Sequence, residues 1–466
     1  MILKSDGIVR KGLLVLLLLA QGCNLAPSYT PPEVSLGEQF IEPHFDGQTA
    51  ANLKWWEVFH DAQLNGLVRE ALDNNRDIGL ALARIEESKA IVAFTRADQF
   101  PFLNARSGIS AGDLGSGAPS LSAFSLLGEL TFEVDLWGKL RNATAAQRAL
   151  LLSSSYNLQT VTISLISQVA DLYFTLIDLD NRIDISKVTV KNRRNAKNVI
   201  DERFKKGIVS ELELNQTQIE ELTVKVNLIQ LERELKLTEH ALRVLLGKTN
   251  GEIKRDKTLQ PFALVKEMPA EVPASLLTRR PDLLSFEENI RAQLAQEGVA
   301  QAQRLPSLQI LGTLGLASVT STDAFGRNTE SWSIGGNLFS PLLNLGKNQA
   351  RVDAQRARVE QSKRSYESAV LNAVREVEDS LTEIQTYHDE YNQRKAQINI
   401  AVHADELTRA RYDNGVASYV EVLDIERSRY TAELNASFTH RRFISSLIKL
   451  YRALGGGWEI SAVNIS

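Results

Sequence analysis

Residue types that support catalysis or metal binding are few in this chain of 466 residues. Its six histidines stand apart, and no two have the spacing that places two metal ligands on one helix face. The single cysteine, Cys23, excludes a disulfide framework and a cysteine-rich metal site. The glycines at 455–457 follow a predicted helix rather than a strand, which indicates a helix end and not a phosphate loop. We therefore predict no enzyme activity, no cofactor and no metal site.

Cys23 points to a different chemistry, the acylation of a cysteine after cleavage of a signal peptide. Basic residues precede a short apolar run at 12–20, which is typical of a secretory signal and too short to span a bilayer. Small residues precede the cysteine as in bacterial lipoprotein cleavage sites, although Ala20 stands where leucine is usual. Asn24 rather than aspartate follows, which in such lipoproteins implies transport to the outer membrane. The alternative is a plain signal peptide that is cleaved nearby.

The composition excludes two further classes of protein. Acidic residues number 57 against 53 basic ones, so no basic face for a nucleic acid is expected. The mean hydropathy of -0.17 excludes a bundle of apolar membrane helices. It does not exclude a β-barrel, because barrel strands are apolar on one face only.

The sequence contains an internal repeat. Residues 146–149 recur at 354–357, and Gly207 corresponds to Gly415, each pair separated by the same 208 positions. A constant offset over more than a hundred residues indicates a tandem duplication. Each copy predicts a helix, two strands, a very long helix, a glycine turn and a second long helix.

The predicted strands alternate with a period of two. Between 124 and 136, apolar residues occupy even positions, while polar residues, several of them carboxylates, occupy odd positions. We predict its partner strand at 103–111, and second-copy strands at 308–319 and 330–339. Four strands cannot close a barrel, since about eight is the smallest number that does. Either the strands keep exposed edges, or several copies of the chain pool them.

The helices that must follow these strands are too long for a globular core. Residues 138–201 contain no proline and no internal glycine after the first residue, and 346–412 are similar. Return helices are predicted at 211–246 and 419–454, and a shorter helix before each strand pair, at 62–97 and 281–302. Apolar residues near 370–384 follow the heptad spacing of a coiled coil. Helices of this length exceed a bilayer about 30 Å thick, so we expect them to project into water.

The duplicated plan and several motifs together resemble the TolC-type outer-membrane efflux factors, and within them the OprM-like (NodT-type) lipoproteins of resistance-nodulation-division pumps. The resemblance covers nearly the whole mature chain. The motifs are Cys23-x3-Pro27-x-Tyr29-x2-Pro32, Trp55-Trp56-x2-Phe59-x-Asp61-x2-Leu64, Arg279-Arg280-Pro281-Asp282 and Arg411-Tyr412-x2-Gly415-x5-Glu421-Val422-Leu423-Asp424.

This resemblance implies a mainly α protein with β strands, a homotrimeric channel-tunnel. A transmembrane barrel of twelve strands, four per chain, would continue into a periplasmic coiled-coil barrel. The implied function is passive efflux of drugs or other small molecules across the outer membrane. The implied partners are outer-membrane lipid, a periplasmic adaptor protein and an inner-membrane resistance-nodulation-division pump, with no nucleic acid.

The resemblance also assigns roles to residues. Glu421 and Asp424, three positions apart on one helix face, correspond to acidic rings that constrict the periplasmic entrance; their alternative role is as solvated surface carboxylates. Tyr412 and Glu213 correspond to links that hold the gate shut, while Ala417 replaces the family's arginine. The turns at Gly207 and Gly415 are the expected adaptor-docking tips.

Two other functions stay open. A type I protein secretion channel shares the fold, whereas a periplasmic adaptor, also lipidated, would carry only one helical hairpin. The expected segments are a signal peptide at 1–22, a lipidated tether at 23–61, a first repeat at 62–247, an equatorial segment at 248–280, a second repeat at 281–455 and a tail at 456–466.

Overall fold

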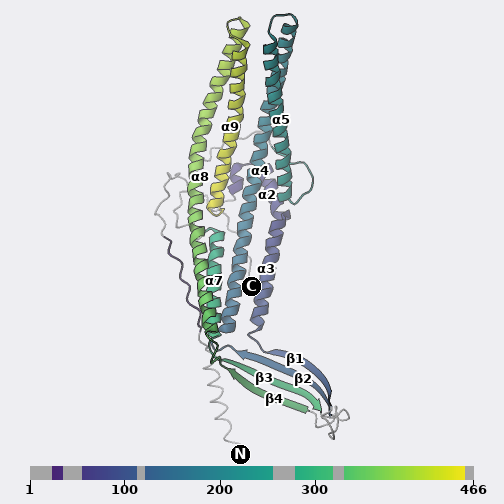
Figure 1. The fold of residues 1–466 in the computed structure, drawn as a ribbon, viewed down its shortest axis with the longest axis vertical. Helices are drawn as coiled ribbons and strands as arrows, with labels where there is room; N and C mark the ends of the chain where they lie inside the picture. The colour runs from purple at the N-terminus through teal and green to yellow at the C-terminus, as the bar shows by residue number, and fades with distance from the viewer. Residues whose placement is uncertain (1–23, 35–54, 113–120, 256–278, 319–329, 457–466) are drawn as a thin grey trace, which may run out of the picture. The chain divides into compact units, whose positions relative to one another are not determined.

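The computed structural model describes residues 24–34, 55–112, 121–255, 279–318 and 330–456 (Figure 1). The chain forms two compact units, and each takes pieces from both repeats. The strand unit comprises 1–34, 83–156 and 284–368, and the hairpin unit comprises 35–82, 157–283 and 369–466. The expected signal peptide and Cys23 lie outside the described residues, as do most of the equatorial segment and the tail.

The strand unit contains one antiparallel sheet of four strands in the order β1-β2-β3-β4. These are β1 (Phe102–Gly112), β2 (Leu121–Val134), β3 (Ser307–Ser318) and β4 (Glu330–Phe339). The expected strands therefore form, and β2 pairs with β3 so that the two repeats share one sheet. The described part of the chain leaves β1 and β4 as its two edges.

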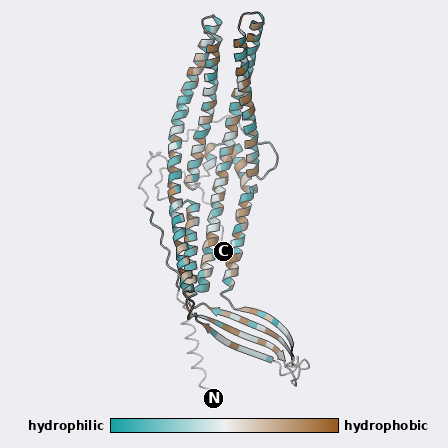
Figure 2. Cartoon of the chain, in the orientation of Figure 1, coloured by the Kyte–Doolittle hydropathy of each residue, from teal (hydrophilic) through white to brown (hydrophobic). Residues whose placement is uncertain are grey.

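The register gives the sheet one apolar and one polar face. Leu103, Leu130 and Ile334 lie in one row with Gly312, while Asn104, Glu129, Thr313 and Ser333 form a row of the other parity. Apolar residues lie along all four strands (Figure 2). Large members of the apolar face are exposed to solvent in a single chain, among them Trp332 at 74% and Leu314 at 72%.

The strand unit also contains α7 (Pro281–Ala302) from residue 284 and most of α3 (Arg76–Ala97). It holds the first parts of α4 (Lys139–Lys205) and α8 (Lys347–Asp413), which continue into the hairpin unit. Each of these two helices has 67 residues, or about 100 Å of helix at 1.5 Å per residue.

The hairpin unit consists of two helical hairpins and a short N-terminal segment. The first hairpin pairs α4 with α5 (Glu211–Leu245), and the second pairs α8 with α9 (Tyr419–Ala453) (Figure 1). The N-terminal segment contributes the 3₁₀-helix η2 (Trp55–Phe59) and α2 (Ala62–Asn74). These bounds match the predicted long helices to within a few residues.

One predicted helix is broken. The sequence predicts a single helix at 62–97, whereas in the structure α2 ends at Asn74 and α3 begins at Arg76. The reason is Asn75, which is buried and whose side chain donates to the carbonyl of Leu245 at 2.9 Å. Its Oδ1 accepts from the backbone N–H groups of Asp77 and Ile78, so it also caps α3.

The core of the hairpin unit explains the sequence motif that runs from Trp55 to Leu64. Trp55 is 1% exposed and stacks on Tyr451 with ring centroids 5.5 Å apart. Asp61 caps α2 and accepts a hydrogen bond from Tyr173, while Leu64 is fully buried. These residues pack on the apolar part of α4. By length and composition that part of α4 could cross a membrane, but 61% of it is buried inside the protein, as in a core helix.

Two further apolar clusters hold the helices together. In the second hairpin, Val377 and Ile384 of α8 pack against Phe443 and Leu447 of α9. Near the turns, Ile200 and Leu214 of the first hairpin pack against three buried residues of α9, which are Tyr419, Val422 and Leu423. The second cluster therefore joins the two hairpins close to their tips.

Candidate functional site

The two hairpin tips have the same geometry. Gly207 and Gly415 adopt φ values of 72° and 73°, which favour glycine. The N–H of Gly207 donates to the Phe204 carbonyl at 2.8 Å, and the N–H of Gly415 donates to the Tyr412 carbonyl at 2.9 Å. The duplication therefore gives one chain two equivalent tips.

The return helices also begin in the same way. Ser210 caps α5 by accepting from the N–H of Glu213, and Ser418 caps α9 by accepting from the N–H of Glu421, both at 3.3 Å. Glu213 and Glu421 are thus equivalent positions of the two repeats. Only the second forms a complete capping box, because Glu421 also accepts from the backbone N–H of Ser418 at 3.1 Å.

Glu421 is held as an anion at the start of α9. The hydrogen bonds from the backbone and hydroxyl of Ser418, with Arg411 at 3.7 Å, lower the pKa of the Glu421 carboxyl. Its side chain is 49% exposed. The structure thus gives Glu421 a structural role that its predicted place in an acidic ring does not require.

Asp424 lies three residues further along the same exposed part of α9. Its side chain is 70% exposed, and Oδ1 is 3.6 Å from an Arg427 nitrogen. Arg427 also contacts Glu220 of α5 at 2.5 Å, which links the two hairpins. Sequence reasoning missed this link, although a buried carboxylate such as Glu220 within a helical seam needs a cationic partner.

Tyr412 contacts the first hairpin through Arg203. The guanidinium donates to the Tyr412 hydroxyl at 2.7 Å and lies 5.5 Å from the ring centroid. The link between the tips through Tyr412 and Glu213, which the resemblance implies, stays a prediction. Ala417 is partly buried in this tip.

In the strand unit, the N-terminal segment lies against α7. The Tyr29 hydroxyl donates to Glu287 at 2.7 Å, and the Arg291 guanidinium lies 4.6 Å from the Tyr29 ring centroid. Closer to Cys23, Ala26 passes Gly298, where an added Cβ would lie 2.8 Å from the Ala26 Cβ. The glycine therefore leaves room for the segment that follows the predicted lipid anchor.

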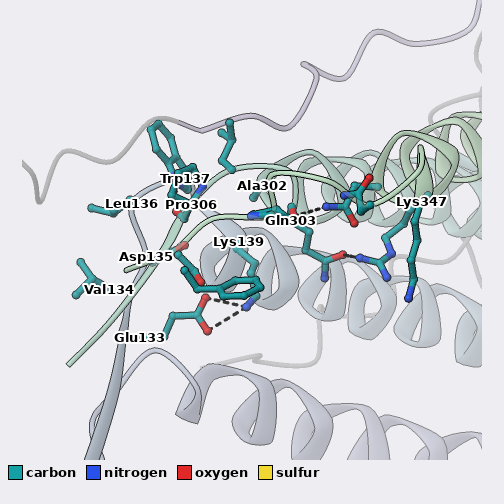
Figure 3. Close-up of a pocket in the computed structure, with 17 residues that line it drawn as sticks. Glu133, Val134, Asp135, Leu136, Trp137, Lys139, Ala302, Gln303, Pro306 and Lys347 are labelled. Carbon is teal, nitrogen blue, oxygen red and sulfur yellow. Dashed lines mark hydrogen bonds and ion pairs between the residues drawn. The ribbon is translucent and has the colours of Figure 1, made fainter. Parts of the chain in front are cut away.

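A cavity of about 310 Å³ lies where the strands meet the helices of this unit (Figure 3). Lys139, the first residue of α4, contacts both carboxylate oxygens of Glu133 at 2.7 and 3.0 Å. The Trp137 indole donates to the Pro306 carbonyl at 2.7 Å and so fixes the end of β2 beside the start of β3. Among the described residues, no group of three or more His, Cys, Asp or Glu side chains could hold a metal ion.

Comparisons with known proteins define the class. The family model described as outer membrane efflux protein matches residues 67–248 and 272–456. The chain is 30% identical over 445 residues to the cation efflux system protein CusC of Escherichia coli O157:H7, covering 94% of this chain and 96% of CusC. It is 29% identical over 446 residues to the probable outer membrane lipoprotein SilC of Salmonella typhimurium, covering 94% and 96% of the two chains.

A solved structure of CusC superposes with a TM-score of 0.85 at 29% identity and covers 93% of this chain and 100% of CusC. The chain belongs to the outer membrane efflux protein family. It is an outer-membrane efflux channel protein, and its mainly helical fold with a small sheet is that of this family.

Proposed function

We propose that three copies of the chain form one passive conduit across the outer membrane. The wall of this conduit in the membrane is a closed barrel of twelve strands. The observation that carries this proposal is the single four-stranded sheet, whose described edges β1 and β4 are unpaired and whose apolar face is exposed. An open apolar edge is a liability in water, and lipid tolerates only closed barrels and helices. Three sheets joined edge to edge remove both problems and leave room for a lumen.

The helices support the same assembly. An apolar stripe on α5 follows heptad spacing of 7, 3, 4 and 3, yet each member is at least 52% exposed in the single chain. Such a stripe is typical of a coiled-coil seam that lacks its partner. A second copy of the chain would cover it. The stripe consists of Leu212, Ile219, Leu222, Val226 and Ile229.

The long helices and the two equivalent tips support the proposal that the channel binds periplasmic partners. Helices of about 100 Å cannot lie within a bilayer about 30 Å thick, so in this proposal they extend into the periplasm. There the turns at Gly207 and Gly415 dock a periplasmic adaptor, which connects the channel to an inner-membrane resistance-nodulation-division pump. The chain itself conducts passively and carries no catalytic step. Acylation of Cys23 and the segment along α7 anchor it to the membrane.

Glu421 and Asp424 would form the periplasmic gate. Each is partly exposed on the first turns of α9, and a trimer converts each residue into a ring of three like charges. Such rings repel anions and concentrate cations. Contacts between the hairpins, which include Tyr412 and the tip residue Glu213 in this proposal, hold the entrance closed.

The gate is tested with Glu421→Gln and Asp424→Asn combined, measured in planar bilayers. Glutamine retains the capping box, so the double variant removes charge while α9 keeps its start. We expect a higher leak conductance and a weaker preference for cations. Asp379→Asn, which removes an equally exposed carboxylate from α8, is the matched control and should change neither. Unchanged ion selectivity in the double variant would remove both residues from the gate.

A further inference from the structure

The interface between the first hairpin and α9 is apolar at its ends and polar in its middle. Apolar clusters around Trp55 and around Ile200 flank a stretch in which α4 and α9 meet through hydrogen-bonded side chains. On α4 these residues recur at intervals of 7, 8 and 7, which keeps them on one face of the helix. The pairs are Asp171 with Ser445, Asp178 with Ser437, Ser186 with Tyr430, and Arg193 with Glu426.

The last of these pairs is ionic and buried. Arg193 of α4 is 2% exposed, and its guanidinium contacts one carboxylate oxygen of Glu426 on α9. The other oxygen is bound by Arg409 of α8. Glu426 thus has two arginines, of which one comes from the first hairpin and one from its own hairpin.

The second hairpin can hold its own charges without Arg193. Arg409 also binds Asp405 at 2.9 Å, and Asp405 is bound in turn by Arg429 at 3.0 Å. All of these residues lie on α8 and α9. If the hairpins separate, Glu426 keeps Arg409 and does not become an unpaired buried charge.

Arg193 in turn lies beside space for water. A cavity of about 350 Å³ is lined by Arg193, Glu426 and Arg409 together with polar side chains of α4, α8 and α9. The Arg193 Nε is buried and has no hydrogen-bond partner among the described residues. A cavity of this size with charged groups in its lining can hold water, which can replace a carboxylate as the partner of a guanidinium.

The pair is poorly suited to a purely stabilising role. Desolvation of two charges commonly cancels their attraction, and apolar residues of similar size usually stabilise at least as well. Burial raises the pKa of the Glu426 carboxyl, with a contribution from Asp405, against the opposing effect of Arg193 and Arg409. A buried ion pair of this kind specifies one arrangement of its two elements, and it can be exchanged for hydration when they separate.

We propose that Arg193 and Glu426 form a second latch, buried between the hairpins, which holds the second hairpin against α4 while the channel is closed. This inference rests on the proposed gate and adds two positioning residues, which are buried between the hairpins and lie outside the proposed acidic rings. Opening transfers Glu426 wholly to Arg409 and leaves Arg193 to water in the cavity.

The test compares Glu426→Gln and Arg193→Met with the wild-type channel in planar bilayers, using the full-length acylated protein. Each variant removes one charge at nearly constant volume. We expect the open probability to rise about tenfold in either, and the double variant to equal the singles because both remove one interaction. Ion selectivity should stay that of the wild type, since Glu421 and Asp424 are intact.

Crosslinking separates a latch from a general loss of stability. Cys23 is the only native cysteine, so cysteines placed at Asn181 and Ser437, whose side chains hydrogen-bond at 2.9 Å across the seam, can be joined by a short bis-maleimide. Because Ser437 also donates to Asp178, the reference is the same cysteine pair with Glu426 intact. In Glu426→Gln channels this crosslink should restore the open probability of that reference. Persistent leak after crosslinking, or unchanged open probability in both single variants, would overturn the proposal.

The two proposals fail differently. If Glu421→Gln with Asp424→Asn changes selectivity while Glu426→Gln changes nothing, the latch is wrong and the gate stands. If the gate variant changes nothing while Glu426→Gln raises open probability and the crosslink reverses it, the latch stands alone. Should Glu426→Gln fail to assemble, Arg193→Lys serves in its place, because it keeps the charge but cannot bridge in the same way.

Discussion

Single residues in this protein combine structural and functional demands. Glu421 completes the capping box of α9, and its carboxylate is also a candidate for the acidic ring of the entrance. Its equivalent in the first repeat, Glu213, follows the cap Ser210 without the reciprocal bond that Glu421 makes. The two tips thus share one geometry, and the Glu421 carboxylate of the second tip has a hydrogen bond to its cap residue that the Glu213 carboxylate of the first tip lacks.

His440 predicts an acid sensitivity of the hairpin unit. Burial, with Lys395 nearby, lowers the pKa of His440 to about 4, and its ring stacks on Tyr391 at 4.4 Å. An unfolded chain takes up this proton near pH 6.5, so stability should fall as the pH drops from about 6.5 towards 4, by up to roughly 3 kcal/mol. The measurement is urea unfolding across this pH range.

The matched variants for this prediction are His440→Gln and His403→Gln. The first removes the buried imidazole and should flatten the pH dependence in that window. The second removes a histidine that is 72% exposed on α8 and should leave the dependence unchanged. Equal slopes in the wild type and His440→Gln would contradict the assignment.

At the scale of elements, α5 has one apolar set that packs within the chain and another that the proposed trimer would cover. Its buried positions, such as Leu231, pack against α4 within the chain, whereas its exposed apolar stripe contacts nothing comparable in the described residues. Substitutions in the stripe should therefore weaken the proposed assembly without disturbing the packing of α5 on α4.

Ile219→Asn combined with Val226→Asn should weaken the trimer and leave the fold of the chain unchanged. Each substitution removes roughly 1.5–3 kcal/mol of apolar burial, and a trimer contains three such seams. The measurement is the fraction of trimer during dilution in detergent, with circular dichroism to monitor helix content. Glu234→Asn, an exposed polar position of the same helix, is the control. Equal trimer fractions in both variants would show that the stripe is not an interface.

The elements differ in how well the sequence predicts them. Period-two alternation and glycine-free helical stretches are local signals, so the strands and the four long helices follow from them to within a few residues. The break at Asn75 does not, because its cause is the carbonyl of Leu245, distant in the sequence. The pairs of Arg203 with Tyr412 and Arg193 with Glu426 also depend on tertiary packing, and only the charged residues at seam positions hinted at them.

At the scale of the whole molecule, the described chain is incomplete as a membrane protein. It offers four strands with two open edges, an apolar sheet face exposed to water and an uncovered helical stripe. Each of these surfaces needs a partner, and identical neighbours supply all of them at once. The duplication fits the proposed trimer, in which two repeats in each of three chains would give six similar units around one axis.

The most direct test is the mass and projection shape of the purified, detergent-solubilised protein, by native mass spectrometry and electron microscopy. We predict the mass of three chains and a ring-shaped particle with a central lumen. Particles with the mass of one chain and no ring, from protein that retains its helix content, would contradict the pooling of strands on which the proposed channel depends.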